Sequence, residues 1–269
     1  LLRLPRPLKA PDAETDPRFR EHLDRLQKRL RSNPHLRGQE ITDRAGIDQA
    51  LVTLDDITGE RIRQTASQVF ITTAISQNGS LDAFLVLAAQ SKLVLEVART
   101  YYQRPTIRDL VYLYSNVAAT AFVAGELEDL DISEQIQSVI TAVFGSAAGA
   151  IPGFGAASTL FVNSVMGGAA NAFLTLRVGV IARQYCRAVV LPPRRAIRRI
   201  AVLEATQLLG GVALTGTRRV AAAMGSAARN SVGGAFESFG DQIKAAGLGI
   251  RDRSVNVIDR LKWRPEGQG

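Results

Sequence analysis

The stretch that decides the fold is QIQSVITAVFGSAAGAIPGFGAASTLFVNSVMGGAANAFLTL, residues 135–176, which holds no charged side chain in 42 positions. Pro152-Gly153 divides it into arms of 17 and 23 residues. At ~1.5 Å per residue, the second arm is long enough to cross a hydrocarbon core of ~30 Å, and the first is short for that. The stretch predicts a long uncharged helical hairpin, and two settings stay open: the interior of a soluble bundle, or a membrane.

Small and polar side chains are frequent in this hairpin. Gly145, Gly149 and Gly153 recur every four residues, a spacing that lets helices approach closely, so we expect them to act in helix packing. Hydroxyl and amide groups, among them Asn163 and Asn171, make the run more polar than an ordinary membrane span.

Charge is distributed unevenly along the chain. Residues 1–134 carry a net charge of −2 and residues 135–269 a net charge of +10. Arginines that directly follow an uncharged run fit the positive-inside pattern and attraction to anionic headgroups. Four of them are expected to contact a membrane surface, and the alternative is a solvated basic face: Arg194, Arg195, Arg198 and Arg199. Nucleic acid is not expected as a partner, because no aromatic side chains are interleaved with these arginines.

The rest of the chain predicts an all-α, multi-helix bundle, because apolar residues recur at helical spacing and no run alternates with period two. The expected helices are one from Pro17 to about Arg31, one after Thr42 that buries Ile47, Leu51 and Leu54, one over Gly59–Ser76, one from Ser80 to Tyr102, and one that Thr106 and Asp109 begin as a capping box. The last of these is expected to bury Leu110, Leu113, Tyr114, Val117, Ala121 and Phe122. The expected divisions are 1–66 (linker and amphipathic helices), 67–190 (helical core) and 191–269 (basic helices and tail).

The sequence contains no motif for catalysis or for a cofactor. It has no Gly-Lys pair for a phosphate loop, no nucleophile elbow and no paired-histidine zinc motif. Cys186 is interpreted as a small packing residue, and Asp55-Asp56 and Asp129/Asp131 as capping or solvated carboxylates. We therefore assign no catalytic, cofactor-binding or metal-binding residue and expect no enzyme activity.

Several short motifs resemble the YcjF-type bacterial inner-membrane proteins, which are built on a domain of unknown function. The motifs are Thr73-Ala74-Ile75-Ser76, Leu81-Asp82-Ala83 with the long apolar helix to Tyr101, Thr175-Leu176-Arg177-Val178-Gly179, and Tyr185-Cys186-Arg187. They span about residues 67–190. Related domains occur fused to, or encoded beside, Era-like GTPases. Family members often carry two transmembrane helices upstream, and nothing before Val69 here is apolar enough for that; the chain, which begins without Met, is a shorter member or a trimmed one.

The resemblance implies a membrane-linked helical module at the cytoplasmic side of the bacterial inner membrane. We expect a non-enzymatic module that docks a protein partner, with anionic lipids, a GTPase and further copies of the chain as the partners to test. The alternative function is an oligomeric pore or transport element formed by the hairpin at 135–176, in which Asn163 and Asn171 line a wet path.

Overall fold

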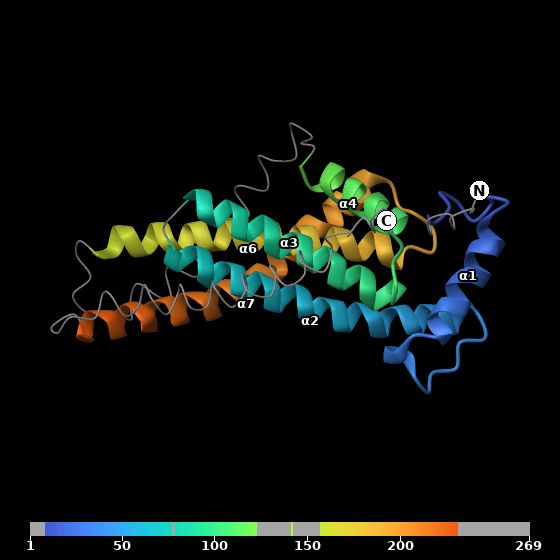
Figure 1. Ribbon diagram of the computed structural model, residues 1–269, viewed down its shortest axis with the longest axis horizontal. Helices are drawn as coiled ribbons and strands as arrows, with labels where there is room; N and C mark the ends of the chain where they lie inside the picture. Colours follow the sequence, from blue (N-terminus) through green and yellow to red (C-terminus); the bar gives the residue numbers. More distant parts are fainter. Residues whose placement is uncertain (1–8, 77–78, 123–140, 142–156, 231–269) are drawn as a thin grey trace, which may run out of the picture. The chain divides into compact units, whose positions relative to one another are not determined.

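Helices form all the regular structure in the part of the chain that the computed structural model describes, residues 9–76, 79–122, 141 and 157–230 (Figure 1). They are α1 (Phe19–Arg31), η1 (Pro34–Leu36, a 3₁₀ turn), α2 (Arg44–Ser76), α3 (Gly79–Tyr102), α4 (Ile107–Phe122), α6 (Ala157–Arg187) and α7 (Arg194–Asn230). These residues contain no strand, which confirms the all-α prediction. The chain falls into two units, 1–220 and 221–269, and the first contains α1 to α6 and most of α7.

The central helix of this unit is α6. It packs along α2 and also against α3 and α4, while α3 packs on α2 (Figure 1). The α2–α6 pair is antiparallel, because Gly168 of α6 lies against Phe70 of α2 and Gly179 lies against Ile62. The described part of the uncharged run, residues 157–176, therefore lies within the core helix. Most of its first arm and the turn at Pro152-Gly153 lie outside the described residues.

The last helix, α7, packs along α2 and α6. Gly216 of α7 abuts the ring of Phe70, and Arg183 of α6 forms an ion pair with Glu204 of α7. One row of buried residues in α7 repeats every fourth position: Ile197, Ala201, Ala205, Leu209, Ala213 and Thr217. A second row, Val212, Gly216 and Val220, joins it in the later turns. Phe70 lies level with Gly168 of α6, so α7 passes Arg183 at Glu204 and reaches the level of Gly168 at Gly216. It therefore runs antiparallel to α6 and parallel to α2.

Local signals at the α3–α4 connection behave as the sequence predicts. The Thr106 backbone N–H donates to Asp109 Oδ2 at 2.9 Å, and the Asp109 N–H donates to Thr106 Oγ1 at 3.2 Å. This reciprocal pair is the predicted capping box, and it starts α4 at Ile107. Just beyond the end of α3, Gln103 adopts a φ of 58°, a left-handed conformation that stops the helix.

Two predictions about the helices are wrong. Gly59 does not begin a new helix, because α2 continues through it; a glycine costs a helix only ~1 kcal/mol, and contacts with α6 on both sides of it hold the helix together. Phe122, expected on the buried face of α4, is 55% exposed. It lies in the last turn of α4, beyond Thr120 and Ala121, which are buried.

Glycine substitutions in α7 test its packing on α2. In Gly216→Ala, the added Cβ overlaps the ring of Phe70, which is fully buried and has no room to turn, so the free energy of unfolding should fall by about 2 kcal/mol. The matched control is Gly211→Ala in the same helix, where nothing lies within 4 Å of the new Cβ. That change should raise stability by roughly 0.5–1 kcal/mol. Urea unfolding measures both, and equal effects would contradict the packing of α7 on α2.

Candidate functional site

The four predicted membrane-contact arginines lie together at the start of α7. Arg194, Arg195 and Arg199 are exposed and Arg198 is half-buried. Arg194 Nη2 donates to Asn116 Oδ1 of α4 at 3.0 Å, which fixes the cluster beside α4. Cations at a helix N-terminus are unfavourable, because that end of the helix dipole is already positive. Their number in this first turn and a half therefore favours an external anionic partner over a role in helix stability.

The predicted packing glycines are not part of the described site. Gly145, Gly149 and Gly153 lie outside the described residues, so their role stays a prediction. Within the described chain, the close helix contacts are made by Gly168, Gly179 and Gly216 instead.

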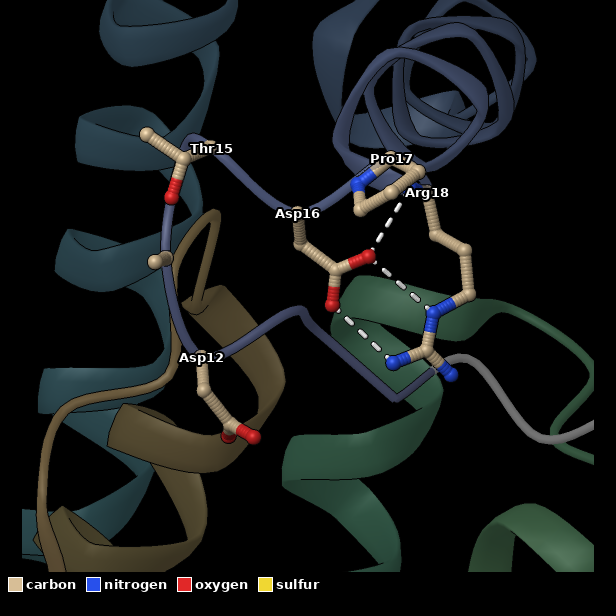
Figure 2. A pocket seen from close by; sticks show the side chains of 6 residues that line it. Asp12, Thr15, Asp16, Pro17 and Arg18 are labelled. Carbon is tan, nitrogen blue, oxygen red and sulfur yellow. Dashed lines mark hydrogen bonds and ion pairs between the residues drawn. The ribbon is translucent and has the colours of Figure 1, made fainter.

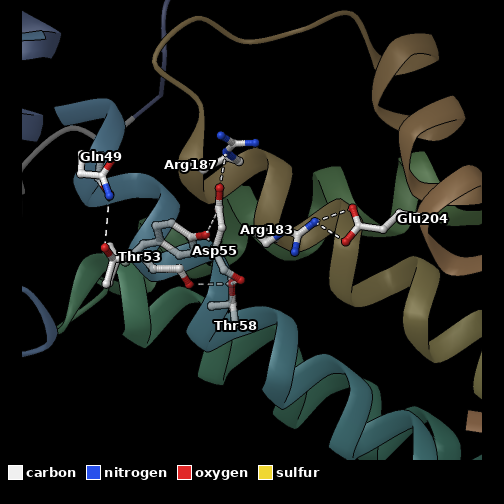
Figure 3. A network of polar contacts seen from close by, with 9 residues as sticks. Gln49, Thr53, Asp55, Thr58, Arg183, Arg187 and Glu204 are labelled. Atoms are coloured by element: carbon white, nitrogen blue, oxygen red, sulfur yellow. Dashed lines mark hydrogen bonds and ion pairs between the residues drawn. The ribbon is translucent and has the colours of Figure 1, made fainter. Parts of the chain in front are cut away.

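A network of polar side chains joins α2, α3 and α6 (Figure 3). The Asp55 carboxylate accepts a hydrogen bond from the Tyr101 hydroxyl, and its Oδ2 lies 3.1 Å from Arg187 Nε. The Tyr101 hydroxyl also lies 3.4 Å from Thr58 Oγ1, which donates to the Leu54 carbonyl at 2.8 Å. The network ties the start of α2 to the ends of α3 and α6.

Asp55 is neither a cap nor a solvated carboxylate, so its sequence interpretation is wrong; its side chain is only 16% exposed. Burial raises its pKa above 3.8, although the Tyr101 hydrogen bond and the Arg187 charge act the other way. The folded state therefore binds a proton at the Asp55 carboxyl group more tightly than the unfolded state does. As a result, Asp55 contributes less to the free energy of unfolding as the pH rises through the range just above 3.8. A sequence signal existed: Asp55 is four residues after Leu51 and three before Thr58, both buried.

The second ion pair of this region, Arg183 with Glu204, links α6 to α7 (Figure 3). The Arg183 side chain is 11% exposed, so its charge lies in the core of the bundle. Both oxygens of Glu204 accept from Arg183 Nη2. A charge this buried requires its partner, because an uncompensated one is costly in the protein interior.

Aromatic, sulfur and basic side chains meet where α1 docks on the bundle. Arg29 stacks on the ring of Tyr102 at 4.7 Å, and Tyr102 is hydrogen bonded to the Cys186 thiol. Burial raises the pKa of Cys186 to about 12, so the thiol stays protonated at neutral pH and is a packing residue, as predicted. His22, buried on α1, has a pKa held below 6.5 chiefly by burial and further by the charges of Arg25 and Arg29.

A shallow hollow near the start of the described chain holds a small polar cluster (Figure 2). Asp16 accepts hydrogen bonds from the Arg18 backbone N–H at 2.8 Å and from its guanidinium at 3.0 and 3.1 Å. These bonds lower the pKa of Asp16. Asp16 therefore stabilises the turn that precedes α1, whose N-cap residue is Arg18 and which has no side-chain cap hydrogen bond, contrary to the helix start expected at Pro17. Among the described residues, no group of three or more His, Cys, Asp or Glu side chains is placed to hold a metal ion.

Glutamate substitutions distinguish the buried ion pair from a surface pair. Glu204→Gln should lower the free energy of unfolding by about 2 kcal/mol, because Arg183 is then left buried without a counter-charge. The control is Glu60→Gln, whose partner Arg63 is exposed, as is Glu60 itself, so little or no change in stability is expected. Urea unfolding at neutral pH compares the two, and a Glu204→Gln variant as stable as Glu60→Gln would refute the structural role of the pair.

Comparison with known proteins places most of the bundle in one family. Residues 39–201 match the model of a domain of unknown function, DUF697, and the match runs from before α2 into the first turns of α7. No curated protein and no solved structure matches the chain. Because the family model covers more than half of the sequence, the chain belongs to the DUF697 family.

Proposed function

We propose that this chain is a non-enzymatic, membrane-associated helical module that docks a protein partner at the cytoplasmic face of the bacterial inner membrane. The observation that carries the proposal is the basic cluster at the start of a long apolar helix. Two segments of the described chain are long and apolar enough to cross a membrane, Phe161–Arg187 in α6 and Arg194–Ala223 in α7. A buried core helix passes the same test of length and composition.

The two apolar segments differ in how much surface they leave open. In its most apolar window, α6 is 67% buried by neighbouring helices, whereas α7 is 39% buried. The apolar side chains of α6 are thus used in protein packing. We therefore assign lipid contact by the described bundle to its outer helices. One of these, α7, carries the arginine cluster.

The arginine cluster supplies the electrostatic part of the proposed attachment. Each basic side chain near an anionic bilayer contributes on the order of 1 kcal/mol, and the effect fades over ~10 Å at 0.1 M salt. Four arginines without an acidic residue among them therefore favour a surface rich in anionic headgroups.

The proposed protein partner is a GTPase, and this part rests on the resemblance to YcjF-type proteins. No residue of the chain is assigned to that contact. Purified chain on bacterial membranes would be cross-linked to its neighbours in the presence of a slowly hydrolysed GTP analogue. A cross-linked protein that binds the analogue is expected, and cross-links made only to proteins without nucleotide affinity would refute the GTPase assignment.

Neutralising the cluster tests the membrane contact directly. Changing Arg194, Arg195, Arg198 and Arg199 to Gln should weaken binding to anionic vesicles by up to roughly a thousandfold at low salt. Helix content should stay the same, because Gln is a comparable helix former. Co-sedimentation with phosphatidylglycerol-containing vesicles measures the loss, which should shrink as salt rises.

The control removes the same charge from the other end of the chain. It changes four of the exposed cations there to Gln: Lys9, Arg20, Lys28 and Arg37. If both quadruple variants bind as the parent does, the arginine cluster is a solvated face only. Equal binding of the parent and the α7 variant to neutral phosphatidylcholine vesicles would assign the attachment to apolar helices instead.

A further inference from the structure

The outer side of α3 and α4 exposes large apolar side chains. They are Phe84 (68% exposed), Leu87 (59%), Ile107 (80%), Val111 (61%) and Phe122 (55%). These five, here called the α3–α4 face, are half of the large apolar side chains that stand exposed in the described chain. Burying such residues against an apolar phase is favourable, so a concentration of them on two adjoining helices calls for an occupant.

The two helices that carry these exposed residues contact one another. The Tyr114 hydroxyl of α4 donates to the Ser91 carbonyl of α3. Leu87 lies one turn before Ser91, and Val111 lies one turn before Tyr114, so each is on the side of its helix where the two helices meet. Figure 1 shows α4 beside α3 on the same side of the bundle.

Within the described residues of α3, α4 and the connection between them, the exposed charges have one sign. The exposed charged side chains of α3, α4 and their connection are all basic: Lys92, Arg99, Arg104 and Arg108. The acidic ones are turned inward, since Asp109 is buried in the capping box and Glu96 is half-buried against Lys92 and Arg61. Asp82 is also only partly exposed.

The arginine cluster of α7 adds further basic side chains beside α4. Arg194 bonds to Asn116 of α4, and its charge also acts on Tyr112, one turn earlier on the same flank. One acid, Asp12, acts on Tyr112 as well. An apolar helix face bordered by basic side chains is the pattern of segments that lie in the interface of an anionic membrane.

The geometry of the bundle favours a side-on arrangement. Arg199 lies five residues before Glu204 in α7, and the uncharged part of α6 begins seven residues beyond Arg183, at Leu176. Because Arg183 and Glu204 are paired, the cluster and the uncharged part are ~18 Å apart along the bundle. A membrane that covers only the uncharged end leaves the arginines beyond the screening length of ~10 Å, whereas a bilayer along the side reaches both.

We infer that the α3–α4 face lies on an anionic lipid bilayer, with its apolar side chains at the boundary between headgroups and acyl chains and the neighbouring arginines on headgroup phosphates. This inference rests on the proposed membrane association and assigns the surface that makes it. Nucleic acid fits the face less well, because three of its five apolar side chains are aliphatic and offer bases no stacking platform. An acidic protein partner is the competing occupant.

An environment-sensitive thiol dye locates the contact. Cysteine would replace Leu87 or Val111 on the face, and Val52 on α2 as a matched control that is 47% exposed. The native Cys186 is buried and does not compete for the dye in the folded protein. On addition of phosphatidylethanolamine–phosphatidylglycerol vesicles to the full chain, dye emission should shift to the blue at positions 87 and 111 and stay unchanged at position 52.

A binding measurement complements the dye. Val111→Gln should weaken co-sedimentation with the same vesicles about fivefold, because one exposed apolar side chain no longer enters the bilayer, and Val52→Gln should leave binding unchanged. If the parent binds but the dye responds alike at 52 and 111, the face is not the contact, while membrane association stands. If the parent does not bind vesicles at all, both proposals fail. A blue shift with polyglutamate and none with vesicles would assign the face to an acidic protein.

Discussion

The close contact between α2 and α6 is the constraint on which the rest of the bundle depends. A Cβ at Gly168 would lie 2.8 Å from the Phe70 carbonyl oxygen, and one at Gly179 would lie 2.8 Å from the Ile62 side chain. At these two positions the helices therefore pack so closely that only glycine, which has no side chain, fits between them. Only 6% of the residues are aromatic and 23 are glycines, so the core depends on close approach of helix backbones rather than on large side chains. With α6 enclosed in this way, α3, α4 and α7 form the outside.

Polar contacts between the helices add to this close packing. Arg183 would be a buried charge without a counter-charge if Glu204 were absent, and the partly exposed Arg187 pairs with the largely buried Asp55. Their pairing holds α7 against α6 and the start of α2 against the end of α6. A separate hydrogen bond, from Arg194 to Asn116, places the first turn of α7 beside α4. The side chains of Arg194, Arg195 and Arg199 are exposed there, whereas Arg183 is enclosed in the core.

The sequence predicts what is local and misses what depends on neighbours. The capping box of Thr106 and Asp109, the burial of Ile47, Leu51 and Leu54, and the packing role of Cys186 follow from spacing and residue type, and the structure confirms them. Gly59 looks like a helix boundary because its local propensity is poor, but tertiary contacts override propensity. Asp55 and Phe122 were misassigned because burial at a helix edge is set by the partner helix, which spacing alone does not reveal. The placement of the arginine cluster beside α4, over 70 residues earlier in the chain, has no signal in the sequence.

Membrane attachment through the outside of the bundle is the central claim of this account, and fractionation of bacterial cells that produce the full chain tests it most directly. Cells would be opened at low salt without detergent, and membranes and soluble protein separated by centrifugation. The account predicts that the chain sediments with the membranes and that high salt releases part of it, because screening weakens the arginine contacts while apolar contacts persist. Recovery of the chain wholly in the soluble fraction at low salt would contradict it.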